Sequence, residues 1–152
     1  MTRIVYLDKR VRTDPQEYAV AFSAQDGELG HAFASLIWGD EVAMATMRKG
    51  VGFYPDGTKG AIKSAFGAEG AVLDDTWEKS VLILSVLVNK PEFDAAESIV
   101  NKWEKPTPYF LGISDCTTFV GEMAASIGLD TPSRLFSPYP IQYVKGLISE
   151  NE

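Results

Sequence analysis

The feature that most constrains the fold is a continuous apolar run, VLILSVLV, over residues 81–88. The run is rich in β-branched residues and leucine, and it is far shorter than the roughly 20 residues needed to cross a bilayer. It therefore predicts a buried central strand, extending from Trp77 to Val88, and not a membrane span. Such a strand has to be covered by other elements of the same chain.

Two earlier segments alternate in the manner of strands. Residues 18–24, YAVAFSA, end in the turn signal QDG, and residues 30–38, GHAFASLIW, end in Gly39-Asp40. Together they predict a hairpin that places His31 at the beginning of its second strand. Residues 42–47 and 50–57 extend this pattern as strand followed by surface loop, whereas residues 59–75 have no sustained period and predict a loop.

The second half of the chain predicts helices. After Pro91, apolar residues recur at helical spacing and indicate a helix from about Pro91 to Lys105. Residues 105–114 contain two prolines and predict extended chain. A second helix is expected from Asp115 to a C-terminal cap at Gly128, and residues 141–148 fit either a short helix or a strand. This order predicts one α+β domain over residues 1–152, with an antiparallel sheet packed against helices.

Composition excludes several classes of function. The formal net charge is -7 and the basic residues are scattered, so nucleic acid is not an expected partner. The N-terminus lacks the apolar core of a signal peptide, so we expect synthesis in the cytoplasm, and no segment predicts a transmembrane helix. The chain has one cysteine and one histidine, which excludes an intramolecular disulfide and metal centres built from several of these residues. We expect neither a metal nor a cofactor.

The lone cysteine lies where cysteine chemistry is favoured. Cys116 falls in the first turn of the predicted helix, and a helix N-terminus or a neighbouring imidazolium stabilises the nucleophilic thiolate. Unpaired backbone N–H groups of that turn, including the N–H of Cys116, could stabilise an oxyanion. His31 is the only candidate base. The structural alternative stays open here, because free cysteines are often buried and a lone histidine is often a structural hydrogen-bonding group.

Short motifs favour the catalytic interpretation. GHAF over residues 30–33 precedes DCTTFV over residues 115–120 and IGL over residues 127–129. This order resembles the circularly permuted papain-like hydrolases of the NlpC/P60 and LRAT-like superfamily, in which the histidine strand comes before the cysteine helix. The segment FYP over residues 53–55 is also similar to related bacterial proteins.

The resemblance implies a role for particular residues. Cys116 would be the nucleophile and His31 the general base, with a third polar residue orienting the imidazole. Thr46, Glu41 and Tyr54 are the candidates for that third residue. Asp115 and Glu122 lie near the thiol but are better explained as a helix cap and a solvated helix position. Six aromatic residues could wall a groove but are more typical of a core, and none is assigned to binding: Tyr18, Trp38, Trp77, Trp103, Tyr109 and Tyr139.

The implied reaction is hydrolysis of an amide through a thioester intermediate. Relatives of this type cleave peptide stems of bacterial cell walls, which favours a peptidoglycan amidase or endopeptidase. Because such a substrate lies outside the cytoplasm, export by a dedicated secretion machine as an antibacterial effector, with an immunity protein as partner, is a further hypothesis. The first alternative is a lipid acyl hydrolase or acyltransferase of the LRAT-like type. The second is a binding module without enzymatic activity.

Overall fold

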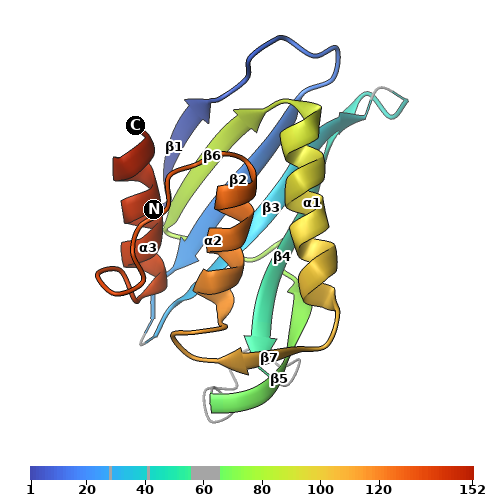
Figure 1. Ribbon diagram of the computed structural model, residues 1–152. Coiled ribbons are helices and arrows are strands. Elements are labelled where there is room, and N and C mark those ends of the chain that lie inside the picture. Colours follow the sequence, from blue (N-terminus) through green and yellow to red (C-terminus); the bar gives the residue numbers. More distant parts are fainter. Residues whose placement is uncertain (28, 41, 56–65) are drawn as a thin grey trace.

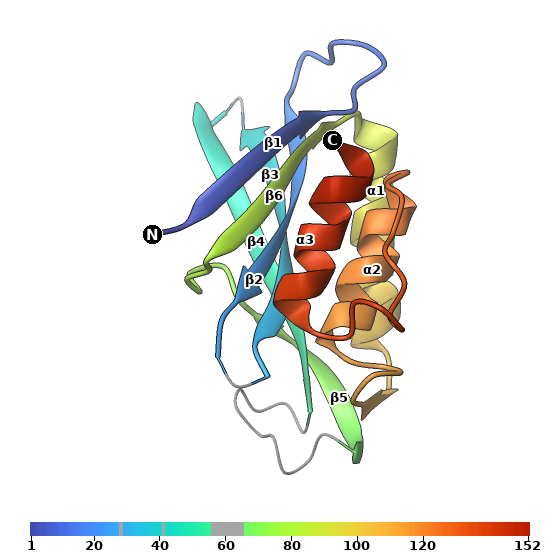
Figure 2. The same cartoon turned by 90° about the vertical axis from the view of Figure 1, so that its left-hand side faces the viewer.

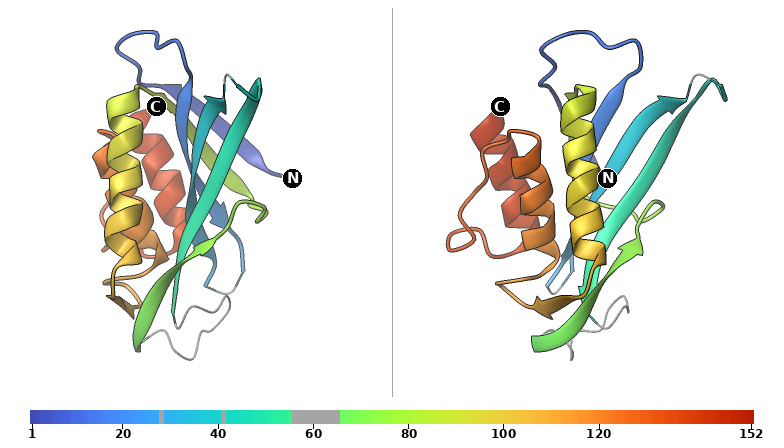
Figure 3. Two further views of the ribbon diagram at one scale, coloured as in Figure 1. Left: turned by 90° about the vertical axis from the view of Figure 1, so that its right-hand side faces the viewer. Right: turned by 45° about the vertical axis from the view of Figure 1, so that its right-hand side comes forward.

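The computed structural model describes residues 1–27, 29–40, 42–55 and 66–152. In chain order its elements are β1 (Arg3–Asp8), β2 (Tyr18–Gln25), β3 (His31–Asp40), β4 (Ala45–Pro55), β5 (Phe66–Asp74), β6 (Leu82–Val88), α1 (Lys90–Glu104), β7 (Thr107–Phe110), α2 (Cys116–Ser126) and α3 (Pro140–Asn151). The strands form one seven-stranded sheet in the order β1-β6-β2-β3-β4-β5-β7 (Figure 1). The three helices lie on the same face of that sheet (Figures 2 and 3).

The α+β prediction is confirmed, but the sheet is mixed and not wholly antiparallel. β1 runs parallel to β6, with Arg3 opposite Leu82 and Asp8 opposite Leu87. All the other neighbouring strands are antiparallel. No strand was predicted over residues 1–12, where charged side chains are mixed among the apolar ones. A parallel neighbour also needs no turn signal in the sequence, because it is joined through a long connection.

The predicted helices at residues 91–105 and 115–128 are confirmed as α1 and α2, and the C-terminal segment is a helix, α3. The end of α2 is fixed by Gly128, which has φ +84° and follows the cap residue Ile127. The N–H groups of Gly128 and Leu129 donate to the carbonyls of Ala125 and Ala124, the pattern of a Schellman motif. The loop prediction for residues 59–75 was wrong where β5 lies; residues 59–65 are outside the described part.

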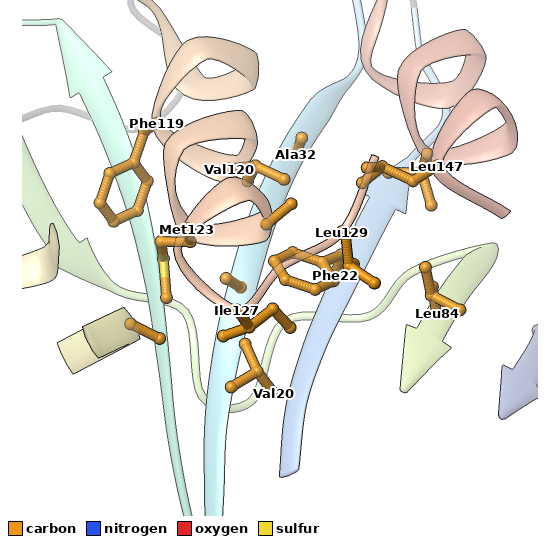
Figure 4. Packing of buried hydrophobic residues seen from close by; sticks show 14 of the residues in the cluster. Val20, Phe22, Ala32, Leu84, Phe119, Val120, Met123, Ile127, Leu129 and Leu147 are labelled. Carbon is orange, nitrogen blue, oxygen red and sulfur yellow. The ribbon is translucent and has the colours of Figure 1, made fainter. Parts of the chain in front are cut away.

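The core lies between the helices and the sheet. Alternate residues of the strands point towards the helices, and Val20 and Phe22 of β2 are fully buried there together with Leu84 of β6. Phe119 and Val120 of α2 are equally buried; Val120 packs over β3, and Phe119 packs beside β4 (Figure 4). Removing each such side chain from water contributes roughly 1.5–3 kcal/mol to stability. This packing fixes α2, and with it Cys116, against the middle of the sheet.

The strands β3 and β4 separate at one end of the sheet. Their ladder ends at Ala34 and Val51, so the first residues of β3 have no partner in β4. Beyond that point β4 stays paired with β5 as far as Pro55. Figure 1 shows the start of β3 diverging from the end of β4, with the beginning of α2 at the same end of the molecule. The divergence leaves room for side chains between the two strands.

Among the described residues, no helix combines the length and the apolar character that crossing a membrane requires.

Candidate active site

His31 is the first residue of β3 and lies where the two strands diverge. Its Nε2 atom is 3.0 Å from Oδ2 of Asp75, whose side chain is completely buried. The Tyr54 hydroxyl donates to both carboxylate oxygens of Asp75, at 2.8 and 2.9 Å. The Tyr54 ring also stacks on the imidazole, with ring centroids 4.3 Å apart. The imidazole is therefore oriented by a carboxylate at its edge and by an aromatic ring on its face.

Asp75 reaches His31 because two glycines of β4 leave space for it. The Asp75 N–H donates to the carbonyl of Gly50 at 2.9 Å, and the Gly50 N–H donates to Thr76 Oγ1 at 3.0 Å. A Cβ atom at Gly50 would lie 2.7 Å from the Asp75 carbonyl carbon. At Gly52 it would collide with the Asp75 carboxylate and lie 2.8 Å from His31 Nε2. The segment KGVG thus lets the chain after β5 fold back over β4.

The surroundings of His31 favour its charged form. Burial alone would lower the pKa of His31, but the hydrogen bond to Asp75 and the electrostatic interactions with Asp75 and Cys116 raise this pKa to about 9. The imidazole therefore interacts with Asp75 and with Cys116 at once. Because Nε2 is occupied by Asp75, the other ring nitrogen, Nδ1, is the one available to the sulfur. At neutral pH the structure favours an imidazolium at this position.

Cys116 is the first residue of α2, and the residue itself is 6% exposed. Asp115 is the N-cap residue: its carboxylate accepts the Thr118 N–H at 3.0 Å, and the Thr118 hydroxyl lies 3.4 Å from the Asp115 N–H. This capping box fixes the first turn and leaves the thiol at the positive end of the helix. The Cys116 sulfur also lies 3.8 Å from Thr117 Oγ1.

Asp115 is held by an arginine from the loop before α3. Arg134 makes a two-pronged contact with the Asp115 carboxylate, with N–O distances of 2.8 and 2.9 Å. Burial alone would raise the pKa of Asp115, but hydrogen bonds from Arg134, Thr118 and Gly112 hold this pKa below its usual value. Asp115 is thus a helix cap with a neutralising partner, in line with its sequence interpretation.

Tyr109, on β7, is a third aromatic residue at the site. It is buried and stacks on Phe53 with ring centroids 5.4 Å apart. Burial in the first place, and then the charges of Cys116 and Asp115, raise the pKa of Tyr109 well above its usual range. The Tyr109 hydroxyl also interacts with the backbone of Cys116. The phenol therefore lies near the N–H group that was expected to stabilise an oxyanion.

The structure brings together His31, Cys116 and Tyr54 among the residues singled out from the sequence. Tyr54 bonds to Asp75 and not to an imidazole nitrogen. Thr46 pairs with Gly39 near the far end of β3, in a hollow on the sheet face opposite the helices. Glu41 lies outside the described residues. The partner of the imidazole is Asp75, which follows a glycine-rich segment and was not among the candidates for the third residue.

Glu122 is not simply a solvated helix position. Its carboxylate accepts a hydrogen bond from Trp103 Nε1 at 2.6 Å and forms an ion pair with Lys102 at 3.1 Å. Both partners belong to α1, so Glu122 joins the two helices and lies away from the thiol. Within the described residues, no group of three or more His, Cys, Asp or Glu side chains is placed to hold a metal ion.

Comparisons with protein-family models, with curated proteins and with solved structures gave no match. The resemblance to the NlpC/P60 and LRAT-like superfamily therefore stays a prediction from the sequence motifs.

Proposed function

We propose that the protein is a thiol-dependent hydrolase that cleaves an amide or ester through a thioester on Cys116. The single observation that carries this proposal is that the imidazole of His31, which is hydrogen-bonded to the buried carboxylate of Asp75, also interacts electrostatically with Cys116 at the start of α2. A nucleophile, a base and a group that orients the base are the parts that such a reaction needs.

The reaction has two balanced steps. In the first, the Cys116 thiolate attacks the carbonyl carbon, the bond to nitrogen or oxygen breaks, and the His31 imidazolium gives its proton to the leaving group. In the second, neutral His31 takes a proton from water, whose oxygen attacks the thioester carbon. The carbon–sulfur bond then breaks, the acid leaves, and the thiolate–imidazolium pair is restored. Asp75 would stabilise the imidazolium of the resting enzyme.

The oxyanion of each step would lie at the N-terminus of α2. The hydroxyl of Tyr109, which interacts with the backbone of Cys116, would be a donor to it. Tyr54 supports the reaction indirectly, because it fixes the carboxylate that fixes the imidazole.

Selective alkylation tests the activated thiol. Because the chain has a single cysteine, iodoacetamide incorporation measured by mass spectrometry reports on Cys116 alone. At pH 5.5 we expect the folded protein to react about tenfold faster than the same chain unfolded in guanidinium, since a thiolate and not a thiol is the reactive form. The His31→Gln variant should lose this advantage. Slower reaction of the folded wild type would favour the binding module, in which the thiol is inert.

Product formation tests the hydrolase itself. Wild type, Cys116→Ala and His31→Gln would be incubated with muropeptides and with small acyl esters, and the released acid quantified. The matched control is Gly39→Ala, where an added Cβ meets only Gln16 at 3.8 Å. The proposal expects turnover by wild type and by the control only. Equal product from wild type and Cys116→Ala would exclude the mechanism.

A further inference from the structure

Exposed apolar side chains lie in two segments of the chain that are tied to Asp115, the residue before the proposed nucleophile. Phe110, the last residue of β7, is 41% exposed, and Ile113, between β7 and α2, is 72% exposed. Leu135, Phe136 and Tyr139, in the loop before α3, are 81%, 83% and 53% exposed. We call these five residues the apolar rim. Large side chains left in water at such density are typical of surfaces that bind an apolar group.

The two segments of the rim converge on the residue beside Cys116. The Asp115 carboxylate accepts the backbone N–H of Gly112 at 2.7 Å, which ties down the first segment. It also pairs with Arg134, whose guanidinium donates in turn to the Pro138 carbonyl at 3.3 Å, which ties down the second. The rim is therefore held in place around the start of α2.

The residue that follows the rim lies near the start of β3. A Cβ added at Gly30, the neighbour of His31, would lie 3.7 Å from Pro140, which directly follows Tyr139. The rim is thus tied to Asp115, the residue before Cys116, and is followed by a residue close to Gly30. An occupant of the rim would therefore be a part of the substrate.

Charge indicates the kind of group that fits. In residues 107–115 and 131–140 the only carboxylate is Asp115 and the only cation is Arg134. These two neutralise each other, because they form a buried ion pair. A charged peptide stem or a phosphate group would find no unpaired partner in these two segments, whereas an apolar chain would lose no solvated charge on binding.

We propose that the rim binds an uncharged acyl chain, so that the preferred substrates are acyl esters or acyl amides and not muropeptides. This inference rests on the proposed thiol-dependent hydrolysis and names its substrate class. Each methylene of the acyl chain that leaves water against the rim would increase kcat/KM by at most roughly fourfold.

The test uses p-nitrophenyl esters of acetyl, butyryl, hexanoyl and octanoyl groups, kept below their aggregation concentrations, with N-acetyl-phenylalanine p-nitrophenyl ester as a peptide-like probe. The rim variant is Leu135→Ser with Phe136→Ser. The matched control is Val42→Ser with Met44→Ser in the β3–β4 turn, where both side chains are more than 90% exposed, at 97% and 91%. Circular dichroism checks that every variant is folded.

We expect kcat/KM of wild type and of the control to rise at least about tenfold from acetyl to octanoyl. In the rim variant the octanoyl value should fall by about tenfold, while the acetyl value stays within about twofold of wild type. Cys116-dependent turnover without a chain-length effect, or with an unchanged rim variant, would overturn the acyl-chain inference and leave the hydrolase intact. A preference for the phenylalanine ester over the octanoyl ester would assign the rim to a peptide side chain, and it would also overturn the acyl-chain inference. Failure to hydrolyse even the acetyl ester in a Cys116-dependent way would overturn the proposed function.

Discussion

Arg134 and Asp115 form a two-pronged ion pair across the start of α2, and the carboxylate lies immediately before Cys116 in the chain. The Asp115 side chain is 3% exposed and the Arg134 side chain 22% exposed. An unpaired carboxylate at this position would repel a thiolate and would oppose its formation. The arginine therefore allows one aspartate to cap the helix without imposing its charge on the neighbouring sulfur.

Replacing Arg134 by glutamine should destabilise the protein and slow its thiol chemistry. Loss of one partner leaves a buried carboxylate uncompensated, which costs about 3 kcal/mol. Urea unfolding at pH 7 measures this loss, and iodoacetamide alkylation at pH 5.5 measures the effect on Cys116. Arg12→Gln is the control, because the Arg12 side chain in the Arg12–Asp14 pair is 67% exposed. The free energy of unfolding of Arg12→Gln should fall by less than about 1 kcal/mol. Equal losses in the two variants would contradict the role assigned to Arg134.

The same pair should make stability depend on acid. Because the pKa of Asp115 is lower in the folded protein than its usual value of 3.8, its contribution to stability is complete above that value and disappears as the pH falls through the folded pKa. The Arg134→Gln variant should show a weaker loss of stability between pH 5 and pH 2 than wild type. Acid unfolding curves of both proteins, followed by circular dichroism, measure this difference. If wild type and Arg134→Gln lost stability in parallel as the pH fell, Arg134 would have no part in the acid dependence.

Gly52→Ala should disable the site while the fold survives. The added methyl group would occupy the place where the Asp75 carboxylate meets His31. Displacing a catalytic group by about 1 Å can cost a hundredfold in rate, so we expect at least about that loss in kcat/KM. Overpacking at a buried position should also reduce the free energy of unfolding by about 1–3 kcal/mol. Gly39→Ala, on β3, should retain both activity and stability, and an active Gly52→Ala enzyme would count against the role of Asp75.

Local patterns predicted much of this architecture. Alternation and turn signals give β2 and β3, helical spacing gives α1 and α2, and the position of Cys116 follows from the N-cap signal of Asp115. β5 could not be predicted, because its glycines and alanines show no period and it is held by pairing with β4 and β7. β1 is likewise held by a strand far away in the chain.

The partner of His31 escaped prediction for a related physical reason. Asp75 is 44 positions from His31 and approaches it only because β5 pairs with β4 and the chain then turns over Gly50. The third residue was expected within residues 41–54, in the segment after the histidine strand, where Tyr54 does lie. The signal that could have pointed to Asp75 is KGVG at residues 49–52, since two glycines in one strand indicate a close approach of another segment.

Tyr109→Phe should reduce the rate of the chemical step. Its hydroxyl interacts with the backbone of Cys116 and can donate its proton to an oxyanion formed there. Removing one oxyanion donor costs about a hundredfold in kcat, and KM should change little because the interaction develops in the transition state. Tyr143→Phe is the control, since that buried hydroxyl lies against Gly121 on α2. A change in KM alone would contradict the assignment to the oxyanion.

The ionisation of His31 should make stability depend on pH in the neutral to alkaline range. The folded pKa of about 9 exceeds the usual value of 6.5, so the protonated imidazole stabilises the fold fully below pH 6.5, and this contribution is lost as the pH rises to 9. The lost stability amounts to as much as about 3 kcal/mol. Urea unfolding of wild type and His31→Gln at pH 6, 7.5 and 9 would measure it, with the difference between the two proteins shrinking at each step. A difference that stayed constant or grew with pH would mean that His31 is neutral in the folded protein, and the thiolate–imidazolium pair would then have no basis.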